Sequence, residues 1–328
     1  MRSTTAQTVP VSALPRPLDF SFPSNRVAVC GAALFGALAL LLGRSPRQAL
    51  GVGGSSLLAW ATGRELDPDS PASAAVALGL AGISGLVQTG KNQTGQNQRA
   101  QKQTAQDRAV RAQTAKNLSG RKRNVAPAIL PGLAVLSAVR LLTGTVGYAA
   151  TRSDTLALSV QAGAAALAGY PVAAALPAAA LAHSAAQQDT LRPHTEWGAA
   201  LALGAGLLPQ VAGHRISGSA GRQVQNKSPG TLLSTLLSLG ALSLGRKLTA
   251  AEQPLSQCDQ VPLTVSASRL RASRVMGLGA LAAGLLRGES ASLVPLAAAC
   301  LGTGLRRAVH GRSSPEQSER STAETDSD

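Results

Sequence analysis

The chain has 328 residues, and its 31 lysines and arginines outnumber its 16 aspartates and glutamates, giving a net charge of +15. Such an excess attracts nucleic acid or an anionic lipid surface. Aromatic residues make up only 2% of the chain, so a soluble core built on aromatic side chains is excluded. The three cysteines, Cys30, Cys258 and Cys300, are far apart, which excludes a disulfide framework and a cysteine metal site.

Residues 1–26 are rich in Ser, Thr and Pro and are predicted to be flexible. Residues 27–43 then form an uninterrupted apolar run between Arg26 and Arg44. Its length of about 17 residues is at the lower limit for a membrane span. A cleaved signal peptide is the alternative, but the run starts late and no small-residue cleavage site follows it. An uncleaved anchor is therefore the better interpretation.

Two further apolar segments, 48–63 and 72–90, complete a first helical block over 27–90. The polar turn "RELDPDSP" separates them. Ser70 and Pro71 have the residue types of an N-cap and of the first helical position, so a helix is predicted to begin there.

A basic, Gln/Thr-rich segment occupies residues 91–125, where three decapeptides share a Gln-Thr pair. Ten residues advance about 1,000° along a helix, so the pairs would not collect on one face. Without an apolar stripe, the segment is predicted to be a water-facing loop. Its cations could contact anionic lipid headgroups or nucleic-acid phosphates, although it has no aromatic residue for base stacking. It could also serve only as a linker that determines topology. The candidate contact residues are Lys91, Arg99, Lys102, Arg108, Arg111, Lys116, Arg121, Lys122 and Arg123.

A second apolar block extends over 126–305, and an acidic, disordered tail is predicted for 306–328. The predicted helical segments of this block are 127–150, 155–186, 197–213, 230–245 and 275–305. Pro171 and Pro177 predict that the second of these is broken. Arg287 and Glu289 predict a hairpin in the last. The stretches 187–196, 214–229 and 246–274 are polar.

Candidate chemistry is sparse. Glu65, Asp67 and Asp69 of "RELDPD" could offer oxygens to a hard cation, but a helix-capping turn with solvent-facing acids is the better interpretation, because three acids rarely fill a site of about six to eight ligands. "GVGGSS" at 51–56 resembles a phosphate-binding loop but lacks its Lys-Ser/Thr ending. The predictions are therefore no catalytic residue, no metal site and no cofactor.

Ionisable residues near the second block give two further candidates. His183 and His194 flank a polar loop that also holds Asp189, Arg192 and Glu196. This loop could bind a ligand or relay protons, but solvation at the membrane edge is the better interpretation. Arg140 lies inside an apolar run, where it could face water, pair with an acid or extend to the membrane edge. Pairs of small residues four apart, such as Ala32 with Gly36 and Ala75 with Gly79, favour close helix packing.

These features predict an all-α fold, a polytopic transmembrane bundle of seven to nine short Ala/Leu/Gly-rich helices with disordered termini and a basic central loop. The excess of cations places that loop in the cytoplasm and "RELDPDSP" outside. The same rule does not place the last third of the chain, because 246–274 carries a net positive charge.

The expected function is that of an integral membrane protein without catalysis, as a scaffold, anchor or transporter-like body in contact with the lipid bilayer. One alternative is an Ala-rich helical protein that binds nucleic acid through 91–125. A second alternative is a membrane-embedded enzyme that uses the acidic turn at 64–69 or the polar loop at 183–196.

Overall fold

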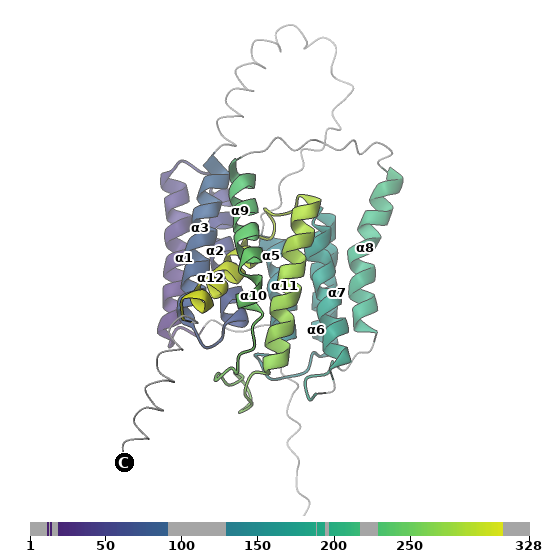
Figure 1. The fold of residues 1–328 in the computed structure, drawn as a ribbon. Helices are drawn as coiled ribbons and strands as arrows, with labels where there is room; N and C mark the ends of the chain where they lie inside the picture. Colours follow the sequence, from purple (N-terminus) through teal and green to yellow (C-terminus); the bar gives the residue numbers. More distant parts are fainter. Residues whose placement is uncertain are drawn as a thin grey trace, which may run out of the picture.

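The chain folds into a bundle of helices that run up and down between two ends (Figure 1). The computed structural model describes residues 12, 14, 19–90, 129–187, 189–193, 197–216 and 229–310. The helices of these residues are α1 (Pro23–Leu41), α2 (Pro46–Leu66), α3 (Pro71–Gly90), α5 (Ile129–Thr143), α6 (Arg152–Leu167), α7 (Pro171–Ala186), α8 (Gly198–Ile216), α9 (Pro229–Ser243), the one-turn α10 (Gly245–Leu248), α11 (Ala267–Arg287) and α12 (Val294–His310). The prediction of an all-α fold is confirmed for this part of the chain. Its ten longer helices exceed the seven to nine expected.

Local sequence signals set the helix boundaries. Proline, which needs no hydrogen-bond acceptor for its nitrogen, occupies the first position of α1, α2, α3 and α7. Ser45 and Gln48 form a capping box at α2, in which Gln48 N lies 3.4 Å from the Ser45 hydroxyl and Ser45 N lies 3.1 Å from Gln48 Oε1. Thr151 and Asp154 form the same motif at α6.

Both predicted interruptions of the second block are present. The segment 155–186 divides at Gly169, whose φ of 86° is in the left-handed region, while Pro177 lies inside α7 without ending it. Arg287 ends α11 and a short turn leads to α12, so the predicted hairpin is confirmed.

Several boundaries differ from the prediction. α1 already begins at Pro23, inside the segment predicted to be flexible, and α5 ends at Thr143 rather than at residue 150. α11 already begins at Ala267, inside the stretch predicted to be a polar connection. Its arginines made that region appear unsuitable for a buried helix, yet Arg269 and Arg274 are buried there as ion pairs. α12 continues to His310, five residues beyond the predicted end of the block. The remaining residues of the predicted tail, 311–328, and the basic segment 91–125 lie outside the described residues.

The two apolar blocks pack against each other. α12 lies on α2 and α3, and α9 also contacts α3. Glycines permit the closest approaches, because a Cβ at Gly302 would lie 2.6 Å from Ser73 O and one at Gly53 would lie 2.8 Å from Ala32 O. The pair Ala32–Gly36 therefore lies at a helix contact, as its spacing predicts. Gly79 does not, since no atom lies within 4 Å of a Cβ built there.

Several hydroxyl groups within the helices bond to a carbonyl of their own helix. Ser56 donates to Val52 O at 3.0 Å and Thr62 donates to Leu58 O at 2.8 Å. Both hydroxyls are buried among apolar residues, and the back-bonding satisfies them without a partner from another helix.

The two ends of the bundle differ in their acids and lysines, although arginines lie at both ends. We call the end that carries the α2–α3, α5–α6, α7–α8 and α10–α11 connections the acidic end, and the opposite end the basic end (Figure 1). Of the 16 acidic residues, only Asp107 and Glu289 belong to connections of the basic end. Lys247 is the only lysine outside those connections.

The outer surface of the bundle is apolar between these ends. Only Ala28, Ala32 and Ala39 of the 19 residues of α1 are buried, while Leu34 and Leu41 are exposed. Among the described residues, every exposed Asp, Glu, Lys or Arg in a helix lies within five residues of a helix end or in α10. Two helical stretches, Pro23–Leu41 and Pro71–Gln88, are long and apolar enough to cross a membrane.

Candidate functional site: ion pairs at the acidic end

The acidic turn at residues 64–69 directs its three carboxylates to three different parts of the bundle. Glu65, in the last turn of α2, is 2.7 Å from Arg140 Nε of α5 and also accepts a hydrogen bond from the Thr145 hydroxyl. Arg140 donates in addition to Leu14 O at 2.5 Å. Of the roles that the sequence allows for Arg140, pairing with an acid is the one observed.

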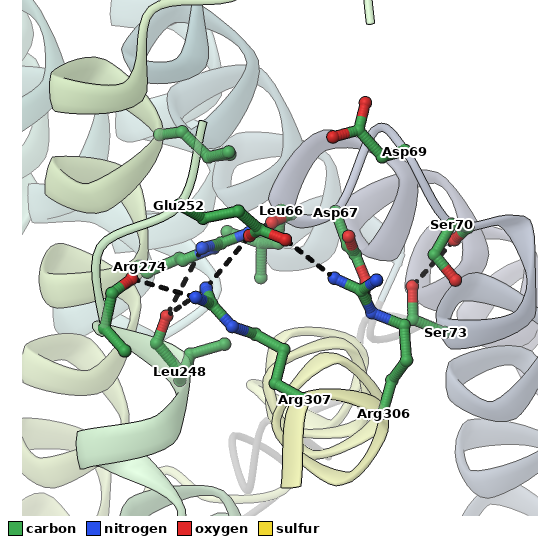
Figure 2. A network of polar contacts seen from close by, with 12 residues as sticks. Leu66, Asp67, Asp69, Ser70, Ser73, Leu248, Glu252, Arg274, Arg306 and Arg307 are labelled. Atoms are coloured by element: carbon green, nitrogen blue, oxygen red, sulfur yellow. Dashed lines mark hydrogen bonds and ion pairs between the residues drawn. The ribbon is translucent and has the colours of Figure 1, made fainter. Parts of the chain in front are cut away.

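Asp67 belongs to an arginine network, which we define as Asp67, Glu252, Arg274, Arg306 and Arg307 (Figure 2). Arg306 of α12 lies between two carboxylates, 2.8 Å from Asp67 Oδ2 and 3.0 Å from Glu252 Oε1. Glu252 Oε2 accepts from Arg274 at 3.0 Å and from Arg307 at 3.1 Å. Glu252 thus joins α11 and α12 through three guanidinium groups.

The same arginines also bind backbone carbonyls at helix ends. Arg274 Nε donates to Leu66 O at 2.9 Å, at the end of α2, and Arg307 donates to Leu248 O at 3.0 Å, at the end of α10. The last carbonyls of a helix lack intrahelical partners and carry partial negative charge, so a guanidinium satisfies both needs.

Asp69 fastens the α10–α11 connection to the acidic turn. Its carboxylate accepts from Leu255 N at 3.0 Å and from Ser256 N at 2.7 Å, and also from the Ser256 hydroxyl. Two backbone amides of a distant segment are thereby held by one side chain (Figure 2 shows the position of Asp69 above the network).

A separate ion pair joins α11 to the α7–α8 connection. Arg269 is fully buried and binds Asp189 with two nitrogens, at 2.6 and 2.7 Å. Its remaining nitrogen lies 3.0 Å from the Ser184 hydroxyl and 3.4 Å from Leu141 O. This bidentate geometry gives the arginine a fixed orientation.

The pKa values follow burial and pairing. Burial alone would raise the pKa of Glu252 and of Asp69, but hydrogen bonds and arginine charges hold both pKa values below their usual range. The hydrogen bond from Arg269 lowers the pKa of Asp189. Asp67 behaves differently: burial raises its pKa, and the Arg306 charge offsets only part of this effect.

This arrangement supports a structural role for the acidic turn better than a catalytic or metal-binding one. Its carboxylates are engaged by arginines, a threonine hydroxyl or backbone amides, which occupy the oxygens that a cation would need. Within the described part of the chain, no group of three His, Cys, Asp or Glu side chains is placed to hold a metal ion.

The other sequence candidates are not brought together into a second site. His183 is half-buried and its Nε2 lies 3.1 Å from Gln187 Nε2, while Asp189 of the same polar loop pairs with Arg269. His194 and Glu196 lie outside the described residues. So do all nine lysines and arginines proposed for phosphate or lipid contact.

Sequence reasoning identified the acids of this end but missed most of their partners. Arg269, Arg274, Arg306 and Arg307 were not singled out, and neither was Glu252. A usable signal was present, since "RLRASRVMG" and "GTGLRRAV" place arginines beside apolar helical residues. Arginines in such positions require carboxylate partners when buried.

Comparison of the chain with protein-family models, with curated proteins and with solved structures gave no match. The function is therefore inferred from the architecture of the bundle and from the distribution of its charged residues.

Proposed function

We propose that the chain is a multi-pass integral membrane protein with a structural role, a scaffold or anchor whose basic end faces the cytoplasm. The observation that carries this proposal is the apolar outer surface between two charged ends. Large apolar side chains such as Leu34, Val76, Ile83, Leu203 and Leu236 are exposed on α1, α3, α8 and α9. In water such a surface promotes aggregation, whereas in lipid it is the expected exterior.

Helix length is compatible with this environment. The ten longer helices have 15 to 21 residues, which corresponds to about 22 to 31 Å at 1.5 Å per residue. A hydrocarbon layer is about 30 Å thick. The shorter helices, α5 and α9, can be accommodated where the bilayer thins around the bundle.

Burial of the arginines at the acidic end supports the assignment of orientation. Lysines and arginines are retained on the cytoplasmic side when they are free near the ends of spans. At the acidic end, Arg140, Arg269, Arg274 and Arg306 are instead held by Glu65, Asp189, Glu252 and Asp67. Arg269 and Arg274, two of the five cations of 246–274, are therefore neutralised by acids, which reduces the opposition of this stretch to an external location. The connections of the basic end, with the nine cations of 91–125, would be cytoplasmic.

The proposed role follows from the contrast between the two ends. The acidic end is cross-linked by ion pairs between connections, and such a rigid end is suited to hold helices in a fixed arrangement. The basic end presents cations that would contact anionic lipid headgroups at about 1 kcal/mol per residue near the surface.

Membrane fractionation tests the proposal. We expect the protein to remain in the membrane pellet after washing at alkaline pH and after washing with high salt, because apolar contacts hold it. Release by salt alone would instead support the alternative in which 91–125 binds nucleic acid, whose affinity falls steeply with salt. Release by alkali without detergent would contradict the membrane-spanning arrangement.

A further inference from the structure

An apolar groove opens on the outer surface of the bundle between α7, α8 and α11. Its volume is about 500 Å³, within the range of small-molecule sites. The walls include Val172, Ala175 and Ala179 of α7 and Met276 and Gly279 of α11. Most of these side chains are small, so the space between the helices is not filled by the protein.

The groove has a charged end and an uncharged end. Arg287, the last residue of α11, borders it at the basic end, and 57% of its side chain is exposed. Glu289 is 3.2 Å from Arg287 Nε, but its other oxygen accepts from Val172 N at 3.0 Å. The Glu289 carboxylate is thus shared between the N-terminus of α7 and the Arg287 guanidinium. The exposed guanidinium keeps N–H donors that face solvent.

The length of the groove matches one leaflet of a bilayer. From Met276 to Arg287 the groove follows α11 for 12 residues, and the 11 steps between them rise about 16 Å at 1.5 Å per residue. Half of a hydrocarbon layer is about 15 Å. A lipid of the leaflet at the basic end would place its acyl chain against Ala175 and Gly279 and its phosphate beside Arg287.

We propose that this groove binds one acyl chain of an anionic phospholipid from the leaflet at the basic end, with Arg287 as the contact for the phosphate. This inference relies on the proposed membrane location and adds a specific ligand to it. The apolar walls select an alkyl chain. Arg287, although it pairs with Glu289 at 3.2 Å, presents exposed donors that favour a headgroup with net negative charge.

Gly279 allows the groove to be filled without disturbing the bundle. No atom lies within 4 Å of a Cβ built at Gly279, and the same is true of Gly79 on α3, which is not part of the groove. Gly279→Leu would therefore occupy the groove, while Gly79→Leu is a matched control with the same gain in helix propensity. Ala175→Leu fills the groove from the opposite wall.

The phosphate contact is tested separately. Arg287→Gln removes this contact, and Arg47→Gln, at an exposed arginine of the same end, is its control.

The test is native mass spectrometry of the full chain in detergent, titrated with phosphatidylglycerol and, separately, with phosphatidylcholine. We expect one tightly held phosphatidylglycerol, preferred about fivefold over phosphatidylcholine. Gly279→Leu and Ala175→Leu should weaken binding about tenfold, because an overfilled site costs that much. Arg287→Gln should remove only the preference. Both control variants should bind as the unaltered protein does.

Three results would overturn the groove proposal. The first is unchanged phosphatidylglycerol binding by Gly279→Leu and Ala175→Leu. The second is a loss of binding in Gly79→Leu as large as that in Gly279→Leu. The third is a dimer that Gly279→Leu converts to a monomer, since the groove would then hold a second copy of the chain. Failure of the membrane location would be seen separately, as release of the protein from membranes by alkali.

Discussion

Individual arginines determine the structure of the acidic end where they have lost contact with water, as Arg269 and Arg274 have. A buried guanidinium is tolerated only when carboxylates and carbonyls surround it. Arg269 meets this condition through Asp189, Ser184 and Leu141. The pair is asymmetric, since Arg269 is fully buried while 36% of the Asp189 side chain is exposed. Removing Asp189 alone should therefore change the stability of the protein differently from removing both side chains.

We expect Asp189→Ala to destabilise the protein by about 3 kcal/mol, because the buried charge of Arg269 is left without its carboxylate. The double variant Asp189→Ala/Arg269→Met should be more stable than Asp189→Ala, since no charge remains to be solvated. Equilibrium unfolding in detergent measures both. If the stability lost by the double variant equalled the sum of the stabilities lost by Asp189→Ala and by Arg269→Met alone, the two side chains would not be coupled.

Acid should weaken the arginine network, and the shifted pKa values indicate how. The pKa of Glu252 is lowered by folding, so its contribution to stability is present above the unfolded value of about 4 and is lost as pH falls through the folded value. The pKa of Asp67 is raised, so its contribution has the opposite sign, being present below about 4 and lost as pH rises.

Glu252→Gln should therefore reduce the loss of stability between about pH 5 and pH 3, whereas Asp67→Asn should increase it. Thermal unfolding of both variants and of the unaltered protein across this range measures the effect. The Arg47→Gln variant, at an exposed arginine remote from the network, should follow the unaltered protein. A smaller acid loss in Asp67→Asn would show that Arg306, rather than burial, dominates the Asp67 carboxyl.

At the scale of helices, the closest contacts are made at small residues. In the proposed membrane location this is expected, because apolar side chains gain little from leaving lipid for protein. Gly302 of α12 lies so close to α3 that a Cβ would be 2.6 Å from Ser73 O. This contact joins helices from the two ends of the sequence.

Gly302→Ala should destabilise the protein by about 2 kcal/mol, because α12 must move away from α3. Gly79→Ala, at a helical glycine with open space around it, should be neutral or stabilising by up to about 1 kcal/mol through helix propensity. Unfolding of the two variants under identical conditions compares them. Equal changes in stability for the two variants would mean that helix propensity, and not the close approach of α12 to α3, determines the effect of the substitution.

The helices themselves were largely predictable from the sequence, because their signals are local. Pro71 after Ser70 predicted the start of α3, and the polar pair Arg287 and Glu289 predicted the turn before α12. The start of α11 at Ala267 was missed, because arginines at this position appear unfavourable until Asp189 and Glu252 are brought next to them by folding. Partners so distant in sequence leave no local pattern.

The candidate site was predictable only in part for the same reason. Glu65, Asp67 and Asp69 stand out in the sequence as a cluster of acids, for which a helix-capping turn with solvent-facing carboxylates was predicted and a shared cation was the alternative. Their actual partners come from α5, α12 and the α10–α11 connection. The spacing of the three acids shows that they are close together in the turn. It does not show that each carboxylate points toward a different helix or connection.

At the scale of the whole molecule, the difference in charge between the two ends makes the orientation in a membrane testable. Leu255 belongs to the acidic end and is 84% exposed. Gln93 belongs to the connection that joins α3 to α5 at the basic end. In a variant with Cys30→Ala, which removes the exposed native thiol, single cysteines at these two positions would report on opposite sides.

We expect an impermeant maleimide to label Leu255→Cys in intact cells and Gln93→Cys only after the membrane is permeabilised. Replacement of the nine cations of 91–125 by Gln should then make Gln93→Cys partly accessible from outside, because in the proposed orientation those cations would retain the segment in the cytoplasm. Replacement of the buried Arg274 by Met is the control, since a paired arginine at the acidic end should not affect orientation. Labelling of both cysteines in intact cells before any replacement would contradict a single orientation. An unchanged pattern after all nine replacements would show that contacts among the helices, rather than the cations of one connection, orient the bundle.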